Sequence, residues 1–127
     1  MRLLVLDAAG MLGHRICRLL GERFEVWGTF RGEPREFEHY NFISQKRAIG
    51  QVDAQDPSTV RRALEKVKPD AVINGIGIVK QRDEAKQAVP SIHVNALFPH
   101  QLVDLCAESG ARVLRTSTPN NNIIAVR

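Results

Sequence analysis

The sequence predicts an α/β fold built on a doubly wound parallel sheet. Along its 127 residues, short apolar runs alternate with stretches of helical periodicity. The first run, Leu3–Leu6, is continuously apolar, as in central parallel strands that are buried on both faces. A glycine-containing turn then joins this run to the first helical pattern. Since strands that alternate with helices form parallel sheets with right-handed crossovers, we expect the strand order 3-2-1-4-5.

The first half of the chain is expected to supply three strands and two helices. An apolar stripe follows the turn and indicates a helix that ends at Gly21. The second strand is predicted over residues 24–31 and the third at Gln51–Asp53. Asp56 followed by Pro57 is typical of a helix N-cap with proline in the first turn. This helix should end at Lys68 and Pro69.

The second half is expected to supply two more strands and one long helix. Ala71–Asn74 is predicted as the fourth strand, and a charged connection follows it. Apolar residues at helical spacing from Val94 to Cys106 indicate the helix, which Pro99 should kink or deprive of a hydrogen bond. A fifth strand should run from Val113 to about Ser117.

Composition and charge exclude several classes of protein. Hydrophobic residues make up 43% of the chain, enough for the core of one domain. There is no apolar run long enough to span a bilayer and no signal-peptide pattern, so we expect a cytoplasmic protein without a membrane partner. The net charge is +4, but the basic residues are dispersed, which argues against nucleic acid. Cys17 and Cys106 lack metal-ligand spacing, and no metal site is predicted.

The candidate site residues lie at the ends of predicted strands, where sheets of this kind bind ligands. Gly10 and Gly13 would let a diphosphate approach the start of the first helix, or would only permit close packing of helix on strand. Arg31 ends the second strand, where arginine accommodates the 2′-phosphate of NADP, although it could equally be a surface residue.

Three further strand ends carry candidates of the same kind. Asp53 could reach an adenine or serve as a turn residue. Asn74 and Gly75 end the fourth strand, where glycine makes room for a ligand or a neighbouring backbone. Asn95 would face the same cleft from the long helix, unless it is an exposed helical residue. A hydroxyl at Ser117 or Thr118 could contact a substrate oxygen.

These residues, taken together, resemble the extended short-chain dehydrogenase/reductase superfamily, and within it the dTDP-4-dehydrorhamnose reductases. The resemblance rests on "AAGMLGHRICRLL", which is similar to the glycine turn and first helix of the family. It also rests on "VDAQDPSTVRRALEKVKPDAVINGIG" and on "HVNALFPHQLVDLCAESGARVLRTST", and covers residues 1–118.

The resemblance implies a Rossmann domain that binds NADP, or else NAD, and takes part in hydride transfer to a keto-sugar nucleotide. It implies that Gly10–Gly13 hold the diphosphate and that Arg31 meets the 2′-phosphate. Thr118 would be the catalytic hydroxyl that hydrogen-bonds the substrate carbonyl. Within that turn the resemblance also implies contacts from Met11 and Leu12. The other cofactor residues that it implies are Asp53, Ala54, Asn74, Gly75, Ile76 and Asn95.

The sequence departs from the family in three respects. Asp7 stands where the first glycine of the turn is expected, and its charge should weaken cofactor binding while stabilising the empty turn. The family's Tyr-x-x-x-Lys pair is absent, because the single tyrosine is Tyr40 and Ser44 follows four residues later. The family usually continues Ser-Thr-Asp after the fifth strand, whereas Pro119 and Asn120 follow Thr118 here. Residues 119–127 are predicted to form an irregular tail after a nucleotide-binding domain at 1–118, with no substrate domain and a C-terminally incomplete sheet.

Two functional hypotheses follow. The first is the cofactor-binding part of a sugar-nucleotide reductase that is truncated and inactive by itself, and that takes its substrate only when a C-terminal region is supplied. The alternative is a non-catalytic nucleotide-binding or interaction module that uses the open sheet edge, for example to form a homodimer. A phosphoacceptor domain centred on Asp7 is disfavoured, because Ala8 and Ala9 offer no further carboxylates for Mg²⁺.

Overall fold

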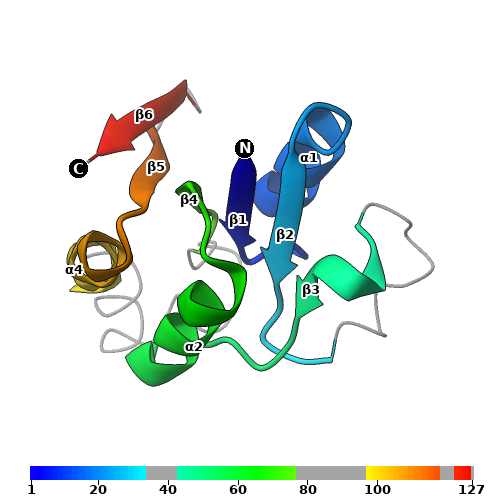
Figure 1. The fold of residues 1–127 in the computed structure, drawn as a ribbon. Coiled ribbons are helices and arrows are strands. Elements are labelled where there is room, and N and C mark those ends of the chain that lie inside the picture. Colours follow the sequence, from blue (N-terminus) through cyan, green and yellow to red (C-terminus); the bar gives the residue numbers. More distant parts are fainter. Residues whose placement is uncertain (34–42, 77–96, 118–121, 127) are drawn as a thin grey trace.

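The computed structural model describes residues 1–33, 43–76, 97–117 and 122–126. They form one six-stranded sheet in the order β3-β2-β1-β4-β5-β6 (Figure 1). The first five strands are parallel and confirm the predicted order, whereas the sixth pairs antiparallel with β5. The strands are β1 (Arg2–Leu6), β2 (Glu25–Thr29), β3 (Ala48–Ile49), β4 (Ala71–Asn74), β5 (Arg112–Ser117) and β6 (Asn122–Val126).

Helices cover both faces of this sheet. Helix α1 (Met11–Leu20) lies on one face, and α2 (Pro57–Val67) and α4 (Phe98–Ser109) lie on the other (Figure 1). A short 3₁₀ turn, η2 (Gln45–Arg47), precedes β3. Among the described residues, no helix is both long and apolar enough to cross a membrane.

Strand β1 contributes to both halves of the core because its side chains alternate between the two faces. Leu3 and Val5 pack in the cluster under α1, whereas Leu4 and Leu6 pack in the larger cluster under α2 and α4. All four side chains are almost fully buried. The continuous apolar run seen in the sequence therefore has the expected cause, which is burial on both faces.

The ends of the helices follow the predicted signals with one exception. An Asp56 carboxylate oxygen accepts a hydrogen bond from the Ser58 N–H at 3.2 Å, and Lys68 closes α2 in a left-handed conformation. Gly21 is the C-cap of α1. Pro99, predicted inside a long helix, lies in the first turn of α4, where helices tolerate proline, and residues 94–96 of the predicted helix lie outside the described residues.

Two strand predictions are corrected. The third strand was expected at Gln51–Asp53 but lies earlier, at Ala48–Ile49. Gln51 has a φ of 57°, which ends the extended conformation, and the apolar Val52 is instead buried in the core beyond the strand. Residues 122–126, expected in an irregular tail, form β6 and cover the edge of β5 that was predicted to be open.

Candidate functional site

The carboxyl ends of the central strands meet at one edge of the sheet, which we call the carboxyl edge. The register pairs Leu6 with Asn74 and Thr29 with Ile49, so these strands end together. The segments that follow them contain the predicted site residues Gly10, Arg31 and Asp53, as well as Gly75. The structure therefore brings to one edge those predicted residues that it describes.

The turn between β1 and α1 is anchored to the neighbouring strand β2. The N–H of Asp7 donates to the hydroxyl oxygen of Thr29 at 3.1 Å, and the N–H of Ala8 donates to the carbonyl of Thr29 at 2.9 Å. Thr29 is 1% exposed and is the one buried polar residue among the described residues. Sequence reasoning missed this role, although a threonine that follows Val26, Trp27 and Gly28 at the end of a strand is a visible signal.

Two glycines permit the close approach of the backbone segments at this turn. A Cβ on Gly13 would lie 2.1 Å from the carbonyl oxygen of Asp7, and a Cβ on Gly75 would lie 2.6 Å from that of Leu6. Gly75 also donates its N–H to the Leu6 carbonyl at 3.1 Å. These distances support the packing interpretation of both glycines, because any side chain would collide with backbone.

Gly10 is the N-cap of α1 and has a different neighbour. Its N–H donates to the Asp7 carbonyl at 3.1 Å. A Cβ on Gly10 would stand 2.7 Å from the Oδ2 atom of Asp7 and 3.2 Å from its Cγ. The space that this glycine leaves is therefore bordered by a carboxylate rather than by backbone alone.

On the β2 and β3 side of the carboxyl edge, the predicted residues differ in how much of them a ligand could reach. Arg31 is exposed and lies two residues after the end of β2. Asp53 is half-buried, and its Oδ1 accepts a hydrogen bond from the Gln55 N–H at 2.9 Å, which is the turn role considered as its alternative. Ala54 is 3% exposed and packs in the core, so only its backbone could contact a ligand.

On the β4 side, Asn74 is half-buried, and its Oδ1 accepts a hydrogen bond from the Ile76 N–H at 3.0 Å. Ile76 packs against the larger core cluster. Leu12 packs against the cluster under α1, and Met11 is the first residue of that helix. Asn95 and Thr118, the predicted catalytic residue, lie outside the described residues.

The chain's thiols are unsuited to nucleophilic chemistry. Burial raises the pKa of Cys17 to about 12, and it does the same for the pKa of Cys106. A thiol with such a pKa carries almost no thiolate at neutral pH. Within the described part of the chain, no group of three or more His, Cys, Asp or Glu side chains is arranged to hold a metal ion.

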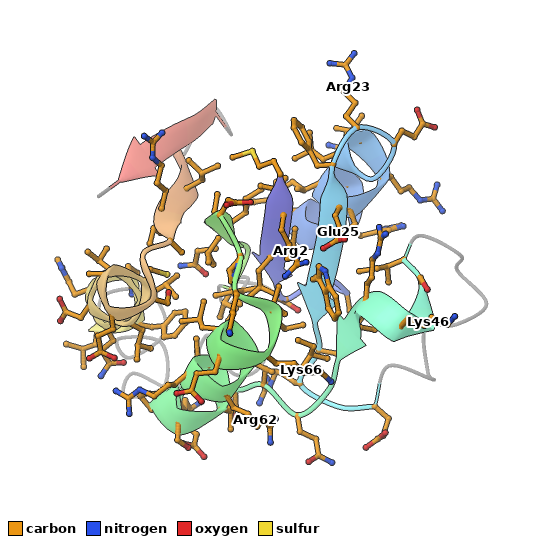
Figure 2. All side chains as sticks on the ribbon, in the orientation of Figure 1. Arg2, Arg23, Glu25, Lys46, Arg62 and Lys66 are labelled. Carbon is orange, nitrogen blue, oxygen red and sulfur yellow. The ribbon has the colours of Figure 1, made fainter. Side chains whose placement is uncertain are left out.

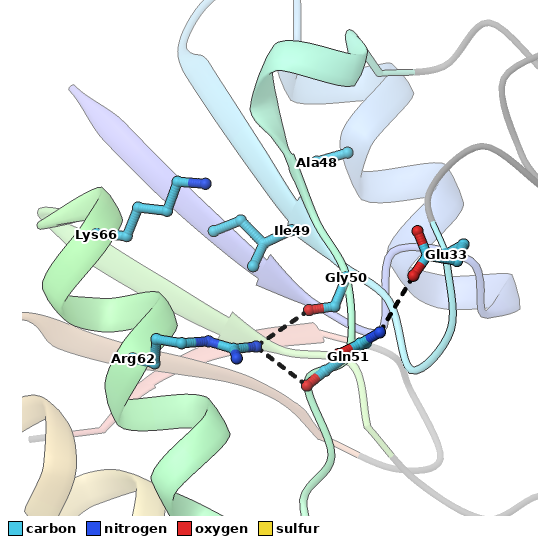
Figure 3. A pocket seen from close by; sticks show the side chains of 7 residues that line it. All are labelled: Glu33, Ala48, Ile49, Gly50, Gln51, Arg62 and Lys66. Carbon is cyan, nitrogen blue, oxygen red and sulfur yellow. Dashed lines mark hydrogen bonds between the residues drawn. The ribbon is translucent and has the colours of Figure 1, made fainter.

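A separate hollow of about 420 Å³ lies between β3 and α2 (Figure 3). One Nη atom of Arg62 donates to the carbonyls of Gly50 and Gln51 at 3.3 and 3.2 Å, and the Gln51 side chain donates to Glu33 at 3.1 Å. These bonds hold the segment after β3 against α2. Of the predicted site residues that the structure describes, none lines this hollow.

Comparison with known proteins decides the family. The model of the family described as RmlD substrate binding domain matches residues 1–120. The chain belongs to the RmlD substrate binding domain family. No curated protein matches this member of the family.

Solved structures agree on the fold of this RmlD family member. UDP-glucose 4-epimerase from Thermus thermophilus, in complex with NAD, is 25% identical, with a TM-score of 0.73. A hypothetical dTDP-4-dehydrorhamnose reductase from Sulfolobus tokodaii is 23% identical, with a TM-score of 0.64. The dTDP-4-dehydrorhamnose reductase from Bacillus anthracis str. Ames, in complex with NADP, is 17% identical, with a TM-score of 0.63.

These matches cover most of this chain but little of the solved proteins. The epimerase match covers 89% of this chain and 36% of the epimerase, and the Sulfolobus match covers 92% and 39%. The Bacillus match covers 88% and 34%. The RmlD family member therefore spans little more than a third of the length of these structures.

The geometry fits a dinucleotide at the carboxyl edge in most respects. The β1–α1 turn presents the N-terminus of a helix, where backbone N–H groups and the helix dipole favour phosphate. Gly13 and Gly75 keep side chains out of the contact between α1 and the strand ends. The Asp7 carboxylate is the one feature of this turn that opposes an anionic ligand.

Proposed function

We propose that this chain is the cofactor-binding part of a nucleotide-sugar oxidoreductase, with NADP as cofactor and NAD as the alternative. The observation that carries the proposal is the β1–turn–α1 unit at the carboxyl edge, which has Gly10 at the helix N-cap and Gly13 packed on the turn. Family membership and neighbours crystallised with NAD or NADP support it.

In this proposal each of the described residues has a role that its position permits. Gly10–Gly13 contact the diphosphate through backbone N–H groups, and Arg31 meets the 2′-phosphate because it is exposed beside the end of β2. Asp53 and Ala54 border the adenine, with Ala54 contributing backbone only. The residues assigned to the ribose side and the remainder of the site are Asn74, Gly75, Ile76 and Asn95.

The reaction proposed for the complete enzyme is hydride transfer to a keto-sugar nucleotide, with Thr118 as the hydroxyl that hydrogen-bonds the carbonyl. The cofactor supplies the hydride when it is bound. Proton donation to the reduced oxygen needs an acid with a tuned pKa, and the 127 residues contain no Tyr-x-x-x-Lys pair. We therefore expect that these 127 residues bind cofactor without reducing a sugar nucleotide by themselves.

Titration with NADPH and NADH, followed by cofactor fluorescence and by thermal shift, tests the proposal. We expect NADPH to bind more tightly, and Arg31→Ala to remove that preference. The matched control is Arg23→Ala, because Arg23 is exposed beyond the far end of α1 and points into solvent (Figure 2). If neither cofactor binds at millimolar concentration, either to the wild-type chain or to Asp7→Gly, the proposal is refuted. Equal affinities in the wild-type chain would refute the preference for NADP alone.

A further inference from the structure

The carboxylate of Asp7 occupies an unusual place in the turn. Asp7 adopts a φ of 60°, in the left-handed region where glycine is standard and where asparagine and aspartate are tolerated best among other residues. In this conformation the Oδ2 atom of Asp7 lies beside Gly10. It would stand 2.7 Å from a Cβ atom added to that glycine. Asp7, which stands where the family has the first glycine of the turn, thus fills the space beside the second glycine, Gly10.

This position is also the electropositive end of a helix. Gly10 is the N-cap of α1, no acidic residue lies in the first turn of that helix, and the cap itself has no side chain. The helix dipole attracts negative charge to its N-terminus, whether the charge comes from a ligand phosphate or from a carboxylate of the protein. Asp7 therefore places a carboxyl group beside the place where the diphosphate is proposed to bind.

We propose that Asp7 is a specificity-determining residue, whose charge lowers the affinity of this turn for ligands that carry a diphosphate, the proposed cofactor included. The inference rests on the proposed cofactor site. Its physical basis is repulsion between like charges, which weakens binding by at least roughly fivefold if the carboxylate and the phosphate stand about 4 Å apart. Neutral portions of the ligand, such as adenosine, do not experience this selection.

Two variants separate charge from shape. Asp7→Asn keeps the size of the side chain and its tolerance of the left-handed conformation, but removes the charge. Asp7→Gly removes both the charge and the atoms beside Gly10. Asp104→Asn is the matched control, because Asp104 is an exposed residue of α4 and its replacement changes the net charge by the same amount.

The experiment measures the dissociation constants of NADPH, ADP-ribose and adenosine for the wild-type chain and the three variants. We expect Asp7→Asn and Asp7→Gly to bind NADPH and ADP-ribose at least about fivefold more tightly, with adenosine and Asp104→Asn unchanged. Raising the salt concentration from about 0.05 to 0.5 M should narrow the gap between wild type and Asp7→Asn, because salt screens the repulsion.

Three results would overturn the inference, and one of them also overturns the proposed function. Equal NADPH affinity in wild type and Asp7→Asn, with binding present in both, refutes the role of the charge and leaves the cofactor site standing. Tighter binding in Asp7→Gly but not in Asp7→Asn shows that shape, not charge, is responsible. If none of the chains binds NADPH or ADP-ribose, the cofactor site itself is wrong and the inference falls with it.

Discussion

The carboxyl edge, where the parallel strands end, and the amino edge, where they begin, are held together by different interactions. At the amino edge, where the parallel strands begin, side chains make the connections: Arg2 pairs with Glu25, and its guanidinium also donates to the Val67 carbonyl at 2.6 Å (Figure 2). The indole of Trp27 donates to the same Glu25 oxygen at 3.0 Å. At the carboxyl edge, backbone segments approach one another directly at Gly13 and Gly75.

This difference separates replaceable contacts from irreplaceable ones. The side chains of Arg2 and Glu25 are 42% and 36% exposed, so water can take over part of their interactions when they are lost. Backbone contacts at a glycine have no such substitute, because an added Cβ must displace main chain. The carboxyl edge should therefore be the less tolerant of mutation at these two positions.

The largest expected effect comes from adding a methyl group at Gly13. On helix propensity alone, Gly13→Ala should stabilise the protein by up to about 1 kcal/mol. The 2.1 Å contact with the Asp7 carbonyl predicts the opposite sign, a destabilisation of about 2 kcal/mol or more. Chemical denaturation of both chains measures the difference in the free energy of unfolding. A stabilised variant would show that the turn can move aside at little cost.

A smaller effect is expected from Thr29→Val, which preserves shape but removes the hydroxyl that accepts the Asp7 N–H. The unsatisfied amide in a partly buried turn should lower the free energy of unfolding by about 1–3 kcal/mol. Thr29→Ser is the matched control, because it retains the acceptor. If the valine and serine variants are equally stable, the hydroxyl does not hold the turn.

At the amino edge, Arg2→Met should have a more modest effect. The methionine keeps much of the aliphatic stem but loses the hydrogen bond to the Val67 carbonyl, which is worth about 1 kcal/mol. Thermal unfolding should show a lower Tm for this variant, with a smaller decrease than for Gly13→Ala. The comparison of the two edges fails if Arg2→Met is the more damaging change.

The smallest effect concerns the pH dependence of stability. Hydrogen bonds from Trp27, first, and from Arg2 hold the pKa of Glu25 below its ordinary value of 4.5. Its folded-state pKa is thus lower than its unfolded one, so its contribution to stability is present above pH 4.5 and is lost as the pH falls through the folded pKa. Acid titration of stability should show this component in the wild type, and its persistence in Glu25→Gln would assign it to another group.

Much of the fold could be predicted from local sequence because the decisive signals are local. The apolar run of β1, the Asp56–Pro57 start of α2 and the strand β4 each follow from the pattern of neighbouring residues. The third strand was misplaced because Val52 is apolar and buried without belonging to a strand. The sequence of β6 predicts irregular structure because its strand conformation depends on pairing with β5, a contact that no local pattern reveals.

For the candidate site, the sequence by itself determined which residues stand at strand ends, since alternation of strands and helices fixes a parallel sheet and collects those ends at one edge. Only the tertiary structure decided what each residue does there. It buried Ala54, committed one oxygen each of Asp53 and Asn74 to backbone N–H groups of their own turns, and joined Asp7 to Thr29, 22 positions later in the sequence. The reason is physical: chemical type and periodicity are properties of a segment, whereas burial and hydrogen bonding depend on which other segment lies against it.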